Sequence, residues 1–121
     1  MLPLFDLGPP RQVSCTICID VDGTAWGIVD PRIRPYTTGN AVDDIAITIE
    51  IINSVRGGTT AESWLISDAA YATVVQVVKW MDETYNGFAI DREHIRTHRD
   101  YNPATLCPGA LSVERVITMS I

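Results

Sequence analysis

The sequence predicts an α/β domain in which a mixed central β-sheet is flanked by helices. Two β-rich runs, residues 13–20 and 44–52, alternate in side-chain character as half-buried strands do. An amphipathic stripe at helical spacing covers residues 68–85, and a second apolar pattern at 111–119 predicts a closing helix. In chain order the elements are a β-hairpin, a strand, a helix, a short strand and a helix, without internal repeats or linkers.

A chain of this length is expected to fold as one domain. Its 121 residues suffice for a hydrophobic core, and 46% of them are hydrophobic, as in ordinary globular proteins. Residues 1–12 are rich in proline and show no periodicity, so we expect a lead-in loop there. Residues 13–121 then form the single domain.

The charge and the cysteine content limit which classes of binding partner and which cellular compartment the sequence predicts. A formal net charge of −6 argues against nucleic-acid binding, which needs clustered lysine and arginine, and against an electrostatic membrane anchor. No apolar run approaches the roughly 20 residues of a membrane span. The first ten residues lack the basic and apolar regions of a signal peptide. Because three cysteines cannot all pair within the chain, we expect synthesis in the reducing cytoplasm.

The first β-rich run predicts one arm of a hairpin. Asp22-Gly23 is a turn signal, and residues 24–29 predict the returning strand. Alternation divides the run into two faces, with Val13, Cys15, Ile17 and Ile19 on one and Ser14, Thr16, Cys18 and Asp20 on the other. A connecting loop is then marked by Pro31, Pro35 and Gly39-Asn40.

The second run, residues 44–52, is the clearest strand. Its isoleucines must face the core, and they are Ile45, Ile47, Ile49 and Ile51. Glu50 lies on the opposite face, where a carboxylate within a strongly β-forming run is unusual. Two interpretations follow: this face is a solvated sheet surface, or it is the floor of an active site.

A long helix is predicted after a loop over residues 53–67. Ser67 is a favourable N-cap, and Asn86-Gly87 supplies the C-terminal stop of a helix that covers residues 68–85. The apolar stripe consists of Ala70, Val74, Val77, Val78 and Met81. Residues 95–98 predict a short final strand or its end.

His98 and Cys107 are the first candidates for chemistry. They lie nine residues apart across a loop that contains proline and glycine, and imidazole and thiolate are side chains well suited to zinc. A catalytic zinc site keeps three protein ligands and leaves a fourth position for water, so this pair lacks one ligand. The alternative is a buried cysteine and an unrelated surface histidine.

Two further patterns favour structural interpretations. His94 and His98 would share a face of the predicted strand but lie roughly 13 Å apart, too far to share an ion, so we interpret His94 as a surface residue. Cys15 and Cys18 match C-x-x-C, but residues three apart in a strand point to opposite faces. We therefore expect neither a redox pair nor a shared metal there.

Four segments jointly resemble the zinc-dependent N-acetylmuramoyl-L-alanine amidases of the amidase-2 family, which share a fold with the peptidoglycan recognition proteins and include many phage endolysins. The segment 13–24, VSCTICIDVDGT, is similar to the family's V-S-x-H-Y-x-I-D-x-D-G-T hairpin. Residues 36–41 stand where the family has W-H-A-G-N, and 45–50 resemble its S-I-G-I-E strand. The most specific match is 97–109, which resembles G-H-R-D…T-x-C-P-G. The resemblance extends from residue 11 to about 118.

The resemblance implies roles for individual residues. His98 and Cys107 would be two of the family's zinc ligands. Glu50 matches a strand glutamate near the catalytic water, and Thr105 a position close to the developing oxyanion. A final pair, Tyr36 and Asn40, falls in the substrate groove. The implied partner is bacterial peptidoglycan, and the implied reaction is zinc-dependent cleavage of the muramoyl–L-alanine amide in cell-wall lysis or turnover.

One departure from the family pattern leaves the function open. The family's first zinc ligand is a histidine at the end of an initial strand, and this chain has no histidine before residue 94. The resemblance thus implies a domain shortened at its N-terminus, in which an exposed sheet edge favours a homodimer. The sequence therefore favours two functions: a zinc amidase, or a non-catalytic module that binds peptidoglycan or muropeptide.

Overall fold

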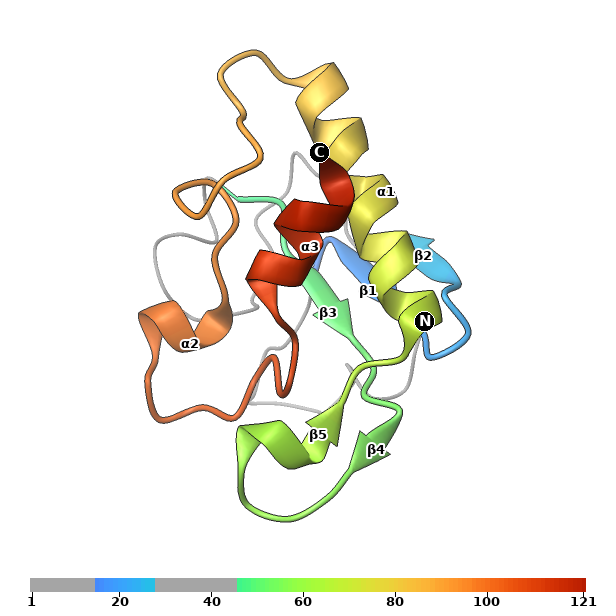
Figure 1. Ribbon diagram of the computed structural model, residues 1–121, viewed down its shortest axis with the longest axis vertical. Coiled ribbons are helices and arrows are strands. Elements are labelled where there is room, and N and C mark those ends of the chain that lie inside the picture. The colour runs from blue at the N-terminus through green and yellow to red at the C-terminus, as the bar shows by residue number, and fades with distance from the viewer. Residues whose placement is uncertain (1–14, 28–45) are drawn as a thin grey trace, which may run out of the picture.

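The computed structural model describes residues 15–27 and 46–121, and these residues form a small α/β fold (Figure 1). Its strands and helices, in chain order, are β1 (Ile17–Ile19), β2 (Ala25–Gly27), β3 (Ile49–Ile51), β4 (Val55–Arg56), β5 (Trp64–Leu65), α1 (Asp68–Thr84), α2 (His98–Tyr101) and α3 (Val113–Ser120). Among these residues, no helix combines the length and the apolar character needed to cross a membrane.

The main sheet has three described strands in the order β2-β1-β3. β1 pairs antiparallel with β2 and parallel with β3, so the sheet is mixed, as predicted. The parallel register places Cys18 opposite Glu50, and it places Ile17 and Ile19 opposite Ile49 and Ile51. One face of the sheet is therefore a row of isoleucines, and the other carries Cys18 and Glu50.

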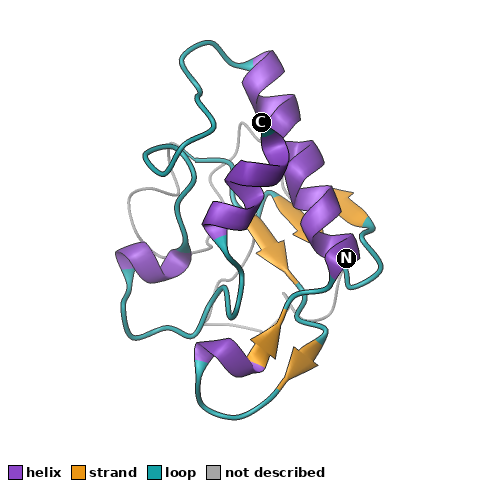
Figure 2. Ribbon diagram, viewed as in Figure 1, coloured by secondary structure: helices purple, strands orange, loops and turns teal. Residues whose placement is uncertain are grey.

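Helices α1 and α3 lie side by side and cover the isoleucine face of the sheet (Figures 1 and 2). The buried core they share with β1 consists of Ile19, Ala70, Tyr71, Val74, Val75, Val78 and Val116. Partly buried Ile17, Ile49 and Ile51 pack against it. The predicted stripe is thus confirmed at three of its positions, while Tyr71 and Val75 widen the buried face beyond it.

The turn between β1 and β2 is docked on the first turns of α1. Gly23 has a φ of 88°, and a Cβ at this position would come within 2.9 Å of the Ala69 carbonyl oxygen. Thr73 Oγ1 donates a hydrogen bond of 2.6 Å to the Gly23 carbonyl. Ser67 caps α1, as predicted, by accepting from the Ala70 N–H, and its hydroxyl donates to Val21 O at 2.6 Å.

Some elements are shorter than predicted or differ in kind. The strands expected at 13–20, 24–29 and 44–52 are three residues each within the described chain. The expected loop at 53–67 contains the small β4–β5 hairpin and a 3₁₀ helix, Ala61–Ser63. The closing helix begins at Val113 rather than at residue 111, because Ser112 caps it.

The short strand predicted at 95–98 is wrong. His98 instead begins α2, and Thr97 is its N-cap. The Thr97 hydroxyl accepts from the Asp100 N–H, while the Asp100 carboxylate accepts from the Thr97 N–H at 2.8 Å. This reciprocal capping box satisfies two backbone donors locally and outweighs the β-propensity of Ile95.

Candidate active site

Glu50 is the middle residue of β3 and lies on the sheet face opposite the isoleucine row. It is half-buried on β3, and its register partner Cys18 has no exposed surface. The neighbouring Cys15 is likewise fully buried. Around Cys18, this face is therefore not a solvated sheet surface, which was the first of the two interpretations of the strand face that carries Glu50.

The alternation predicted for the first strand does not extend back to Cys15. The N–H groups of Thr16 and Ile17 both donate to Thr48 O, at 3.1 and 3.0 Å, which interrupts the two-residue period just before β1 begins. Burial raises the pKa of Cys15 to about 12, and the nearby Cys18 thiol and Glu50 carboxylate add to this shift. Burial and then Glu50 also raise the pKa of Cys18 to about 11. Both thiols are therefore protonated at neutral pH.

Cys107 lies on the loop between α2 and α3, and Glu50 is close enough to influence it. Burial raises the pKa of Cys107 to about 12, with the Glu50 carboxylate adding to the shift and the Arg99 guanidinium opposing it. Thr105 Oγ1 accepts a hydrogen bond of 3.2 Å from the Cys107 N–H. Because the Thr105 oxygen acts as acceptor here, its hydroxyl proton is still available for donation.

The loop that carries Cys107 is fastened on two sides. On one side, Arg99 of α2 donates to Leu106 O at 3.2 Å and to Gly109 O at 3.3 Å. On the other side, the Ala110 N–H donates to Trp64 O of β5 at 2.9 Å. The peptide bond between Cys107 and Pro108 is cis.

His98 is half-buried at the first position of α2, and its carbonyl accepts from the Asn102 N–H at 2.9 Å. Its neighbour Arg99 contacts the loop that carries Cys107, so α2 and this loop are adjacent. Two other predicted site residues, Tyr36 and Asn40, lie outside the described part of the chain. The connecting loop predicted from the prolines and the glycine at 31–40 lies outside it too.

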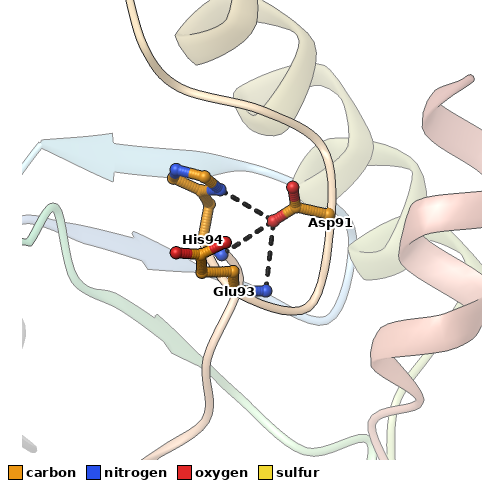
Figure 3. A group of neighbouring side chains, drawn as sticks. All are labelled: Asp91, Glu93 and His94. Atoms are coloured by element: carbon orange, nitrogen blue, oxygen red, sulfur yellow. Dashed lines mark hydrogen bonds and ion pairs between the residues drawn. The ribbon is translucent and has the colours of Figure 1, made fainter.

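A separate cluster joins Asp91, Glu93 and His94 on the segment between α1 and α2 (Figure 3). Asp91 Oδ1 lies 2.7 Å from His94 Nδ1 and accepts from the N–H groups of Glu93 and His94 at 3.1 and 3.0 Å. His94 is exposed, as predicted, and its ring also meets Phe88 edge-on at 5.7 Å between centroids. These contacts describe an aspartate-capped turn that holds an imidazole.

The Asp91–His94 pair predicts a specific pH response. The hydrogen bond with Asp91 raises the pKa of His94 above 6.5, and the same bond holds the pKa of Asp91 below 3.8. The stabilisation that comes from the raised pKa of His94 is complete below pH 6.5, and it disappears as the pH rises through that raised pKa. The stabilisation that comes from the lowered pKa of Asp91 is complete above pH 3.8, and it disappears as the pH falls through that lowered pKa. The pair is therefore expected to stabilise this turn most between these two values.

The measurement is an NMR titration of the His94 ring protons. The Asp91→Asn variant is expected to move the midpoint back toward 6.5, whereas Asp82→Asn, an exposed change on α1, leaves it in place. A His94 midpoint that is the same in wild type and Asp91→Asn contradicts the pairing.

The structure thus brings Glu50 close to Cys107 and joins Thr105 to Cys107 directly. Two features were missed at the level of sequence. The bridge from Arg99 has no sequence signal, because its acceptors are backbone carbonyls. The Asp91–His94 turn had one, since an aspartate three residues before a histidine can cap a turn and bind its ring.

Comparison with known proteins supplies the family. The sequence model of the N-acetylmuramoyl-L-alanine amidase family matches residues 6–110, which is most of the 121-residue chain. The chain belongs to this family. Searches of curated proteins and of solved structures each found no significant match. The family accounts for the mixed sheet with helices, and it supports a peptidoglycan amidase activity in general terms.

The donors present in this family member can be compared with the needs of zinc. Imidazole and thiolate are zinc ligands, so the side-chain types at His98 and Cys107 fit the ion. Over residues 15–27 and 46–121, however, no three potential ligands that include either of them have ligand atoms within 4.8 Å of one another. The described residues therefore match the ion in donor type but not in ligand number.

Proposed function

We propose that this chain hydrolyses the amide bond between the N-acetylmuramoyl group and L-alanine in bacterial peptidoglycan, with zinc held by His98 and Cys107, in endolysin-type lysis of the cell wall. The observation that carries the proposal is the family match over residues 6–110, which includes both residues. Zinc bound there would lower the pKa of its water and polarise the amide carbonyl.

Glu50 is proposed as the group that takes the proton of the attacking water. It is half-buried on the sheet face beside Cys107, and a carboxylate in such a setting is a suitable general base. Thr105 is proposed to stabilise the oxyanion, because its hydroxyl proton is available while its oxygen accepts the Cys107 N–H. Tyr36 and Asn40 stay a prediction for the substrate groove.

A second function is favoured by one observation. The described residues lack a third zinc ligand near His98 and Cys107, and a site with two protein ligands binds zinc more weakly than one with three. A module that binds peptidoglycan without cleaving it needs no such site. The predicted homodimer, which would bring a second copy of each ligand, also stays a prediction.

One experiment separates the two functions. The purified chain is incubated with bacterial cell walls, with and without added zinc, and newly exposed L-alanine amino groups are counted by chemical labelling. Zinc-dependent appearance of these groups, abolished in Cys107→Ser, supports the amidase. Cosedimentation with walls without new amino groups supports the binding module, and the absence of both results contradicts each proposal. Loss of wall turbidity tests the lytic role.

A further inference from the structure

The side chain of Arg99 connects α2 to the loop that carries Cys107. Its Nη1 donates to Leu106 O at 3.2 Å, and its Nη2 donates to Gly109 O at 3.3 Å. These two carbonyls stand on either side of the Cys107-Pro108 peptide. A planar guanidinium presents its donors in a fixed fork, so binding both carbonyls fixes their relative position.

The same loop has few other constraints between these two carbonyls. The Gly109 N–H donates to Leu106 O at 2.7 Å and closes a turn, and Ala110 joins the turn to Trp64 of β5. Neither bond reaches α2. Among the described residues, the side-chain hydrogen bonds from α2 to this turn come from Arg99.

The other arginines near α2 are directed elsewhere. Arg92 pairs with Asp100 at 3.1 Å, and Arg96 lies 3.9 Å from the same carboxylate and over the ring of Tyr101. These contacts involve Asp100 and Tyr101 of α2 and not the loop. Arg99 is therefore distinct from its charged neighbours in what it binds.

We propose that Arg99 is a positioning residue that holds the Cys107 loop against α2 and so sets where Cys107 lies relative to His98. Its importance for catalysis rests on the proposed function. The contact itself does not, because it joins two segments of this chain whether or not an amide is cleaved.

The test is native-state alkylation of the cysteines by iodoacetamide, followed by mass spectrometry of each site, in the metal-free protein. Arg99→Lys keeps the positive charge beside the thiol but cannot bridge both carbonyls. We expect alkylation of Cys107 to become about tenfold faster, the effect expected from loss of one charge-assisted hydrogen bond. Cys15 and Cys18, which are fully buried, report global unfolding and should be unchanged.

The matched control is Arg96→Lys, which changes an arginine three residues earlier without touching the loop and should leave all three rates as they are. A second measurement follows hydrogen exchange at the amides of Gly109 and Ala110, which is expected to accelerate only in Arg99→Lys. Equal acceleration at all three cysteines, a variant that does not fold, or unchanged Cys107 labelling each overturns the positioning role. None of these readouts depends on amidase activity, so this inference and the proposed function can fail separately.

Discussion

Replacement of Glu50 by glutamine is expected to lower the rate of muramoyl–L-alanine hydrolysis by about 10²- to 10⁴-fold, the usual contribution of a general base. Glutamine keeps the size and shape of the side chain but cannot accept the proton of water at neutral pH. Glu50 is half-buried, and its carboxylate raises the pKa of the three nearby cysteine thiols, an influence that the glutamine variant removes. Turnover is therefore expected to fall in a variant that still folds.

The measurement is the initial rate of amino-group release from cell walls, together with urea unfolding of each variant. Glu83→Gln, an exposed glutamate at the end of α1, is the control and should retain wild-type turnover. A Glu50→Gln protein that cleaves within twofold of wild type would show that another group handles the proton. If turnover is lost together with folding, Glu50 is needed for the fold, and its proposed role as general base is withdrawn.

Local signals in the sequence were sufficient for much of the fold. Asp22-Gly23 is a strong turn signal between strands, and the Gly23 N–H does close a turn onto Asp20 O. Ser67 caps a helix through its own hydroxyl, so both features were predictable from a few residues. The isoleucine row of β3 was predictable because alternation at a period of two identifies a buried face, and Ile49 and Ile51 do pack on the core.

Long-range contacts decided what the sequence could not predict. β4 and β5 have two residues each, too few for any periodicity, and Trp64 of β5 is engaged by Ala110, which is 46 positions away. The first strand is shortened because Thr16 and Ile17 both donate to Thr48. At the site, His98 and Cys107 could be singled out from their side-chain types and spacing, and the family motif then implied their roles. The Arg99 bridge could not be predicted, because it depends on how the loop returns to α2.

The second large effect concerns Gly109, which lies two residues after Cys107. Its φ is 70°, and a Cβ there would come 2.6 Å from Trp64 O and 2.9 Å from Asn53 Nδ2. Gly109→Ala must therefore displace the loop from β5 and lose the bond from the Ala110 N–H to Trp64 O. We expect a loss of about 2–5 kcal/mol in the free energy of unfolding, combining the backbone cost of a left-handed residue with overpacking.

Gly87→Ala is the matched control for the backbone term. Gly87 has a φ of 84°, but a Cβ at this position meets no atom within 4 Å. Gly87→Ala should therefore lower the free energy of unfolding only by the cost of placing alanine in the left-handed conformation, about 1–2 kcal/mol. Urea unfolding of both variants gives the difference, which measures how tightly the Cys107 loop is pressed against β5. Equal losses at the two glycines would mean that this loop can move away from Trp64 at little cost, and a loop so free could not by itself hold Cys107 in one place.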